Sequence, residues 1–336
     1  MSNSQPNPVL FRYVHVSDFH FCVRPWRTNA LFKRDLHRTL DTSAGKVPQQ
    51  EWNSIFQPSS YIPEVASGVA RFCYWLNRKF DGIIVSGDLS TTGKPGDLAT
   101  ARTFISDPPT GQTVYVRPNE ATISGTIAPG SIHLIPGNHD RYQNDLGRPG
   151  SPNFVLMFAD KFMRNFDGEV GHWIRRKSER ELGFVYADFS LRARSDATRS
   201  WVGAYGQGRV YANVLQKLRN KTQELKDRGL PVVWIIHFAP WDCDPNLQLI
   251  GFSQVTDLAA SLGILCTLCG HTHEQDNIVR KGHQIYCAGS AGCVDSKAKS
   301  RVHVIDMSID DLGGSVSRRN FGWSWDEDAF VELASD

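Results

Sequence analysis

The sequence lacks the features that mark membrane proteins, secreted proteins and proteins that coat nucleic acids. No stretch approaches the roughly 20 consecutive apolar residues that a membrane-spanning helix needs. The first eight residues are polar, and charged side chains interrupt the apolar stretch that follows, so no signal peptide is visible. The formal net charge is only +2 over 336 residues, which argues against a nucleic-acid coat or a membrane-surface protein.

Cysteine occurs in an odd number and at irregular spacings. The seven cysteines therefore do not form the paired pattern of a disulfide framework, and we expect free thiols in a reducing cytoplasm. Cys266 and Cys269 have Cys-x-x-Cys spacing, but they lie in an apolar run that predicts a buried strand. Residues three apart in a strand face opposite sides, so we expect no joint metal or redox role for this pair.

The composition is that of a folded protein with a substantial core. Hydrophobic residues make up 40% of the chain and charged residues 21%. We expect a disordered tail at 1–8, one domain over 9–310 and a C-terminal extension at 311–336. Irregular segments near 21–60 and 107–130 are expected to be insertions within the domain.

Apolar runs rich in β-branched residues alternate with amphipathic segments, which predicts an α/β fold. The expected helices are 62–80, 99–106, 210–226 and 253–262. The expected strands are 9–16, 82–86, 132–135, 184–189, 232–236, 264–268, 284–288 and 302–305.

Five of these predicted strands end in Asp, Asn or His. In α/β sheets, ligands bind outside the carboxyl ends of the strands, so these polar side chains mark a candidate site. The motifs, in chain order, are Asp18-Phe-His20, Gly87-Asp88, Gly137-Asn-His-Asp140, His237 and Gly270-His-Thr-His273.

The side chains of these motifs are metal donors. Carboxylate and imidazole together suit first-row ions such as Mn, Fe or Zn. Residues i and i+2 of an extended segment project to the same side, so we expect Asp18 with His20, and His271 with His273, each to aim two donors at one point. The glycines within three of the motifs permit tight turns close to a bound ion.

Each motif alone has a simpler explanation. Gly-Asp is usually a turn, His237 by itself would be a strand-end histidine, and Gly-Asn-His-Asp could cap a helix. The five motifs together, in this order and each at the end of an apolar run, favour a metal site.

The set resembles the signature of the calcineurin-like metallophosphoesterase superfamily, D-x-H, G-D, G-N-H-[DE], H and G-H-x-H, over about residues 13–290. The resemblance implies a four-layer α/β/β/α sandwich of two mixed β-sheets flanked by helices. It also implies two divalent or trivalent metal ions per chain. By motif, Asp18, His20, Asp88 and His273 would hold the first ion, and Asp88, Asn138, His237 and His271 the second, with Asp88 as the bridge.

The resemblance further implies hydrolysis of a phosphate ester by attack of a metal-bound hydroxide. His139 would donate a proton to the leaving oxygen, or would instead stabilise charge on the phosphate. Asp140 would orient the His139 ring or stabilise its charge.

The second motif narrows the expected reaction. Its continuation, Gly87-Asp-Leu-Ser-Thr-Thr-Gly-Lys-Pro95, resembles the G-D-L-x-x-x-G-x-P of the cyclic-nucleotide phosphodiesterase branch. Protein Ser/Thr phosphatases carry Arg-Gly after the Gly-Asp and a G-N-H-E motif, whereas this chain has Thr92-Gly93 and Asp140. We therefore expect a small phosphodiester, such as a cyclic or other nucleotide, as substrate. The two insertions are longer than in compact enzymes of this branch, so the natural substrate stays open.

Four residues are candidates for contact with the substrate. Arg141 follows the Gly-Asn-His-Asp motif, and Arg24 and Arg27 lie in the first insertion; arginine can bind a phosphate through two hydrogen bonds. Trp241 follows His237 closely and could line the site. The simpler explanations are solvated arginines on loops and a packed tryptophan.

Other functions remain open. The chain could be a phosphomonoesterase or a nuclease of the same superfamily, although little chain follows residue 310 to form a DNA-capping region. It could also be a non-catalytic scaffold on this fold, although such proteins typically lose ligands and all seven are present here. The sequence predicts no membrane partner and gives no strong nucleic-acid signal, and the oligomeric state stays undetermined.

Overall fold

The structure is a computed structural model that describes residues 8–23, 62–76, 79–106, 122–123, 129–143, 149–198, 206–292, 300–311 and 313–334. Several expected features lie outside the described residues: Arg24, Arg27, residues 1–7 of the expected tail at 1–8, and most of both expected insertions.

The first sheet has six strands in the order β14-β13-β12-β1-β2-β3. β1, β2 and β3 are parallel, and β12, β13 and β14 continue the sheet in antiparallel fashion. The segment expected as a C-terminal extension thus contributes two strands to this sheet. The strands are β1 (Val9–Val16), β2 (Gly82–Val85), β3 (Ile132–Leu134), β12 (Arg301–Ile309), β13 (Gly314–Ser324) and β14 (Ala329–Glu332).

The second sheet also has six strands, in the order β10-β11-β9-β7-β5-β4. Its four central strands are parallel, and its two outer strands are antiparallel to their neighbours. The strands are β4 (Val170–Lys177), β5 (Arg180–Ala187), β7 (Val232–Ile236), β9 (Cys266–Cys269), β10 (Asp276–Arg280) and β11 (His283–Cys287); β6 (Gly208–Arg209) and β8 (Leu249–Ile250) form a separate short pair.

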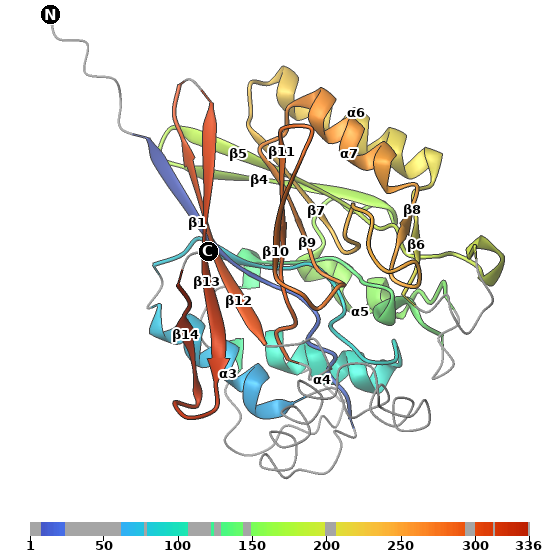
Figure 1. The fold of residues 1–336 in the computed structure, drawn as a ribbon, viewed down its shortest axis with the longest axis vertical. Helices are drawn as coiled ribbons and strands as arrows, with labels where there is room; N and C mark the ends of the chain where they lie inside the picture. The colour runs from blue at the N-terminus through green and yellow to red at the C-terminus, as the bar shows by residue number, and fades with distance from the viewer. Residues whose placement is uncertain are drawn as a thin grey trace, which may run out of the picture.

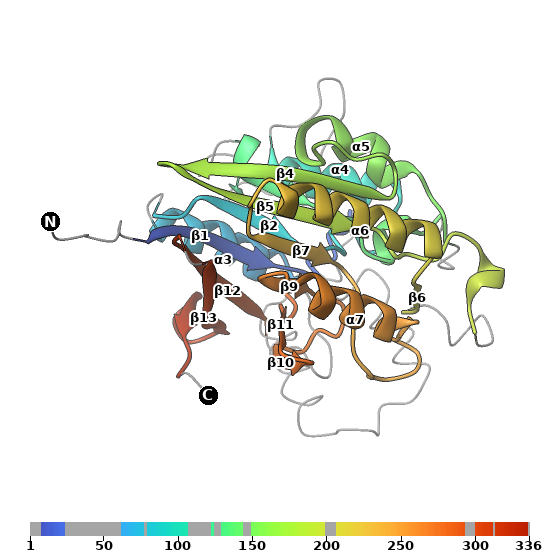
Figure 2. The same ribbon diagram turned by 90° about the horizontal axis from the view of Figure 1, so that it is seen from above.

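Helices cover the outer faces of the two sheets (Figures 1 and 2). α6 and α7 lie along the second sheet because each has one apolar side; in α6, Val214, Leu218 and Leu225 recur at helical spacing and are fully buried. α3 packs on the first sheet, where its Phe72 ring contacts Phe321 of β13. The helices are α3 (Pro63–Trp75), α4 (Pro95–Ile105), α5 (Asn153–Phe162), α6 (Ala212–Asp227) and α7 (Phe252–Leu262).

The core lies on both sides of the second sheet, as the alternation along β7 shows. Val233 and Ile235 belong to the cluster between the two sheets, whereas Trp234, one residue out of phase, belongs to the cluster under α6 and α7. Tyr13 of β1 meets Phe184 of β5 across the sheets, with ring centroids 5.1 Å apart. The four-layer α/β/β/α sandwich expected from the resemblance is confirmed.

Cys266 and Cys269 lie on opposite faces of β9, as expected, because they belong to different clusters. None of the helices in the described ranges combines the length and apolar character that crossing a bilayer requires.

Candidate metal centre

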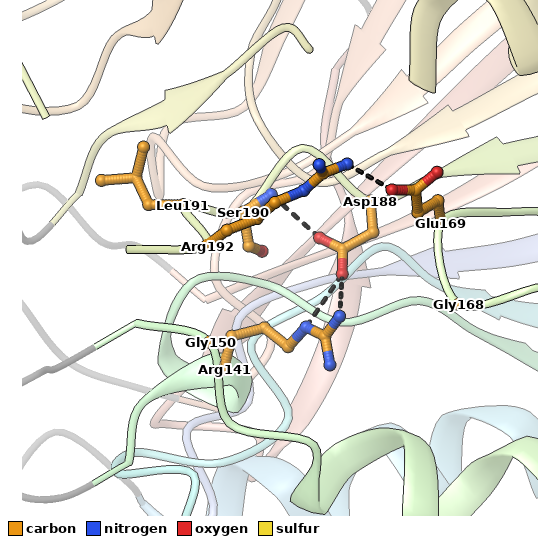
Figure 3. Close-up of a pocket in the computed structure, with 8 residues that line it drawn as sticks. All are labelled: Arg141, Gly150, Gly168, Glu169, Asp188, Ser190, Leu191 and Arg192. Atoms are coloured by element: carbon orange, nitrogen blue, oxygen red, sulfur yellow. Dashed lines mark hydrogen bonds and ion pairs between the residues drawn. The ribbon is translucent and has the colours of Figure 1, made fainter. Parts of the chain in front are cut away.

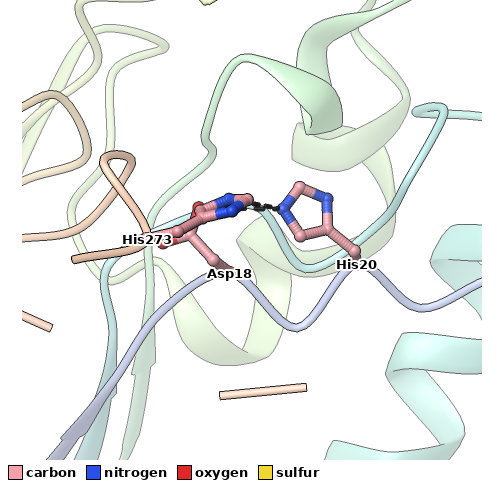
Figure 4. Close-up of side chains that lie close together, drawn as sticks. All are labelled: Asp18, His20 and His273. Carbon is pink, nitrogen blue, oxygen red and sulfur yellow. Dashed lines mark hydrogen bonds and ion pairs between the residues drawn. The ribbon is translucent and has the colours of Figure 1, made fainter. Parts of the chain in front are cut away.

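The seven predicted ligands and His139 converge where the carboxyl ends of β1, β2, β3, β7 and β9 meet. Metal-binding atoms within 4.8 Å of one another form three overlapping groups. Asp88 belongs to two of these groups, which places it between them. The groups are Asp18, His20 and His273 (Figure 4); His20, Asp88 and His139; and Asp88, His237 and His271.

The first group brings two histidine nitrogens and a carboxylate together. His20 Nε2 lies 3.1 Å from His273 Nε2, and Asp18 Oδ1 lies 3.2 Å from the same His273 atom. The other oxygen of Asp18 accepts the backbone N–H of His271 at 2.9 Å. Burial opposes ionisation of Asp18, but His273 and His20 lower its pKa well below the usual value, so it is a carboxylate ready for a cation.

The group of Asp88, His237 and His271 contains two imidazoles whose tautomers are fixed by backbone carbonyls. His237 Nδ1 donates to the Ser86 carbonyl at 2.8 Å, and His271 Nε2 donates to the Leu247 carbonyl at 2.9 Å. A carbonyl oxygen can only accept, so in the neutral rings the remaining nitrogens, His237 Nε2 and His271 Nδ1, carry lone pairs. These two atoms face each other at 3.2 Å.

Two oxygen acceptors, from Asn138 and Asp88, lie beside these two nitrogens. Asn138 donates through Nδ2 to the Tyr142 hydroxyl at 2.9 Å, so its Oδ1 is the atom that lies 3.0 Å from His237 Nε2. Asp88 Oδ2 lies 3.4 Å from the same nitrogen. Four acceptors converge on one point, an arrangement that favours a cation at their centre.

A proton and a metal ion would compete for this point. Burial lowers the pKa of His237, but the carboxylates of Asp88 and Asp18 raise it to about 9 when no metal competes. The donor set of imidazole nitrogens, carboxylates and one amide oxygen fits a divalent first-row ion.

Five of the seven predicted ligands have left-handed backbone conformations, which corrects the expectation of extended segments. Their φ values are 56° for Asp18, 53° for His20, 52° for Asp88, 78° for His271 and 58° for His273. Such φ values are uncommon for residues other than glycine and cost free energy. The two donors of each i, i+2 pair are therefore placed by tight turns beyond the strands.

The i, i+2 pairs also behave differently from each other. Asp18 and His20 share one group, as expected, but His271 and His273 do not. His273 joins Asp18, whereas His271 joins Asp88 and His237.

Two of the motif glycines are required by close approach. Gly87 has φ of +110°, and a Cβ there would lie 2.4 Å from His237 Nδ1. A Cβ on Gly137 would lie 2.0 Å from Asp88 Oδ1. Any larger residue at Gly137 would displace a predicted ligand.

His139 reaches the centre from a short 3₁₀ helix, His139–Arg141. Its backbone N–H donates to Asp88 Oδ1 at 2.9 Å, and its ring Nδ1 donates to the Thr91 carbonyl at 2.7 Å. Its ring stands edge-on to His20, with centroids 4.6 Å apart. Burial lowers the pKa of His139 to about 4, although Asp88 opposes the shift.

Asp140 forms its hydrogen bonds with two loops, whereas the expected orienting role would need a bond to the His139 ring. Its carboxylate accepts hydrogen bonds from the amides of Leu89, Ser90 and Gly137 and from the Ser90 hydroxyl, at 2.7–3.0 Å. The Thr91 carbonyl is the group that orients His139. Burial and the charge of Asp88 raise the pKa of Asp140 to about 7.

Arg141, a candidate for contact with a phosphate, is held by partners within the protein. Its guanidinium donates to Asp188 through Nε at 2.9 Å (Figure 3). It also donates to the Ser151 carbonyl at 2.9 Å. Arg141 and Asp188 line a cavity of about 250 Å³. Arg192 and Glu169, which form an ion pair, line the same cavity.

Trp241, another candidate for contact with the substrate, is largely buried. Trp241 is only 6% exposed and packs in the cluster under α6 and α7. Arg24 and Arg27 are the two candidates outside the described residues.

Sequence reasoning missed the groups that support the ligands. Ser86, Thr91 and Leu247 act through backbone carbonyls, which leave no signal in residue type. Tyr142, which accepts from Asn138, lies four residues after it, a spacing that could have indicated a contact.

Comparisons with known proteins agree with this geometry. The calcineurin-like phosphoesterase family matches residues 11–275, which include all five motifs. A candidate 5′-nucleotidase from Staphylococcus aureus, solved with alpha-ketoglutarate, superposes with a TM-score of 0.51 at 13% identity, covering 98% of this chain and 55% of that protein. This chain thus spans about half the length of that protein.

A dimetal phosphatase from Danio rerio superposes with a TM-score of 0.51 at 11% identity, covering 92% of this chain and 99% of that one. At these identities the superpositions show a shared fold. No curated protein matches the sequence. The match over most of the chain, together with the convergence of all five motifs at one edge, shows that this protein belongs to the calcineurin-like phosphoesterase family.

Proposed function

We propose that this protein is a dinuclear metal-dependent phosphodiesterase that acts on a small diester such as a cyclic nucleotide. The observation that carries the proposal is the convergence of lone pairs from seven side chains at one edge of the two sheets. Asp18, His20, Asp88 and His273 would hold one ion, and Asp88, Asn138, His237 and His271 the other.

The ions and His139 would divide the chemistry. When bound, two such ions lower the pKa of a water and neutralise charge on phosphate oxygens. The Nδ1–H group of His139 donates to the Thr91 carbonyl, which leaves Nε2 as the ring nitrogen available to the substrate. A phosphate anion beside Nε2 would favour the imidazolium, which could then donate its Nε2 proton to the leaving oxygen or stabilise charge.

The preference for a diester rests on the segment Gly87–Pro95. Its sequence resembles the cyclic-nucleotide branch, and its backbone contacts the site residues directly through Thr91. The Gly93 carbonyl accepts from Asn153 Nδ2 at 3.1 Å, which ties the segment to α5.

We further propose Mn, Fe or Zn as the metals, because the donor set suits all three. The six cysteines in the described ranges are free thiols, which is consistent with a reducing compartment such as the cytoplasm.

The test is hydrolysis of bis(p-nitrophenyl) phosphate against p-nitrophenyl phosphate, with Mn²⁺ and after chelation, with Asp88→Asn as the inactive control. Metal-dependent preference for the diester supports the proposal and justifies a screen of cyclic nucleotides. Preference for the monoester would move the protein to the phosphomonoesterases. Less than about one metal per chain after reconstitution, with no activity on either ester, would favour the scaffold.

A further inference from the structure

The buried carboxylate of Asp140 joins two loops that carry the centre. Asp140 is fully buried and follows His139 in the loop after β3. Its Oδ2 accepts the amides of Leu89 and Gly137 at 3.0 Å each, and its Oδ1 accepts the amide and the hydroxyl of Ser90 at 2.7 and 2.8 Å. Asp140 thereby fixes the loop after β2 to its own loop.

Ser90 is the link in this arrangement that can be changed without removing a charge. It is fully buried, and its hydroxyl donates to Asp140 while accepting the amide of Gly93 at 3.1 Å. Both bonds hold the short stretch between Ser90 and Gly93. The carbonyl of Thr91, which accepts the ring proton of His139 at 2.7 Å, lies in this stretch.

We propose that Ser90 is a positioning residue for His139, acting through the Thr91 carbonyl with Asp140 as its anchor. The consequences for turnover rest on the proposed function above. Because the carbonyl accepts only from Nδ1, its position fixes both the tautomer and the rotation of the ring. A loop that moves by a fraction of an ångström would weaken the hydrogen bond from Nδ1–H and misplace Nε2. Small misplacements of a reacting group have large effects on rate.

The first experiment reads the His139 ring without any substrate. Long-range ¹H–¹⁵N spectra of labelled, metal-free protein distinguish the two neutral tautomers, and His139→Ala identifies the signal. In the wild type we expect the Nδ1–H tautomer alone. In Ser90→Ala we expect a mixture with the Nε2–H form, whereas an unchanged tautomer would overturn the proposal.

The second experiment is a double-mutant cycle with the substrate found above. Ser90→Ala should lower kcat about three- to tenfold with KM and metal content unchanged. In a His139→Ala background the same substitution should have no further effect on kcat, because the group that it positions is absent. An equal loss in both backgrounds would mean that Ser90 acts on the loop in general, and the proposal would be wrong.

Thr92→Val is the matched control. The Thr92 hydroxyl lies in the same loop but donates to Asp97 at 2.6 Å and has no link to the His139 ring. This variant should keep kcat within about twofold and should keep the Nδ1–H tautomer. If the wild type proves inactive on every ester, the proposed function fails, but the tautomer spectra still decide the role of Ser90.

Discussion

His237 Nε2 lies 3.2 Å from His271 Nδ1, with the opposite nitrogen of each ring bound to a backbone carbonyl. With both rings neutral the two lone pairs would repel each other, so the pair needs either a proton on His237, whose pKa is raised to about 9, or a bound cation. A metal ion would displace that proton, and this competition makes the candidate metal centre testable with purified protein.

Asp88 offers the sharpest test of the dinuclear centre. Asp88→Asn removes the negative charge shared by two of the three ligand groups, so we expect loss of bound metal and of activity together. Metal analysis after reconstitution, alongside the ester assay, measures both. Wild-type activity in this variant would rule out the bridging role.

His139→Ala should separate turnover from metal binding. The variant should keep most of its metal, because the seven other side chains remain, and should lose at least about tenfold in kcat through lost proton donation or charge stabilisation. Metal content and kcat are measured on the same preparation. Loss of the metal would instead identify His139 as a ligand, which its place beside His20 and Asp88 would then explain.

Gly137→Ala should abolish metal binding although none of the predicted ligands is substituted. The new Cβ would lie 2.0 Å from Asp88 Oδ1, so the carboxylate must move. Metal content and the melting temperature should both fall. Gly282→Ala is the control, since its φ of +77° is also strained but nothing lies within 4 Å; it should lose about 1 kcal/mol of stability and keep its metal.

His133 should make the protein sensitive to acid. Burial, together with Arg164 and Arg175, lowers the pKa of His133 to about 3, below that of the unfolded chain. The unfolded state therefore binds a proton first as the pH falls below about 6.5, and stability decreases by about 1.4 kcal/mol per pH unit until the folded-state pKa is reached.

His133→Phe removes this titration and keeps a flat ring against Trp173, whose centroid lies 3.8 Å from that of His133. The free energy of unfolding is measured with urea, in the presence of chelator, at pH 6.5 and at pH 5. Between these two pH values, the wild type should lose about 2 kcal/mol more than the variant. A constant difference between the two proteins would contradict the assignment of a neutral, buried His133.

Arg141 should affect stability more than catalysis. Arg141→Met leaves Asp188 buried without its ion-pair partner, so we expect a loss of about 2 kcal/mol in unfolding free energy, with kcat/KM changed by less than about threefold. Adding Asp188→Asn should restore part of the stability. A large rise in KM that persists in the double variant would instead show that Arg141 contacts the substrate.

The sequence by itself determined the class of fold and which side chains meet at the candidate centre. The strands Val9–Val16 and Val232–Ile236 begin and end where their β-branched and aromatic residues predict, because such residues favour strands and bury well between layers. The motifs could be found for a similar reason, since metal donors at strand ends belong to few residue types.

The tertiary structure decided how those residues are used. The strands β13 and β14 contain polar positions and were not expected, because their pairing with β12 is set by contacts distant in sequence. Arg141 and Trp241 looked available in sequence, and only the fold placed Asp188 beside one and a hydrophobic cluster around the other.

The left-handed turns at Asp18, His20, Asp88, His271 and His273 belong to the same category. Residue type favours other backbone conformations at these positions, and neighbouring segments impose the strained one. Likewise, the carbonyls of Ser86, Thr91 and Leu247 fix three histidine tautomers, and every residue has a carbonyl. The sequence thus determined the donors, whereas their direction and protonation depend on backbone atoms that only folding brings together.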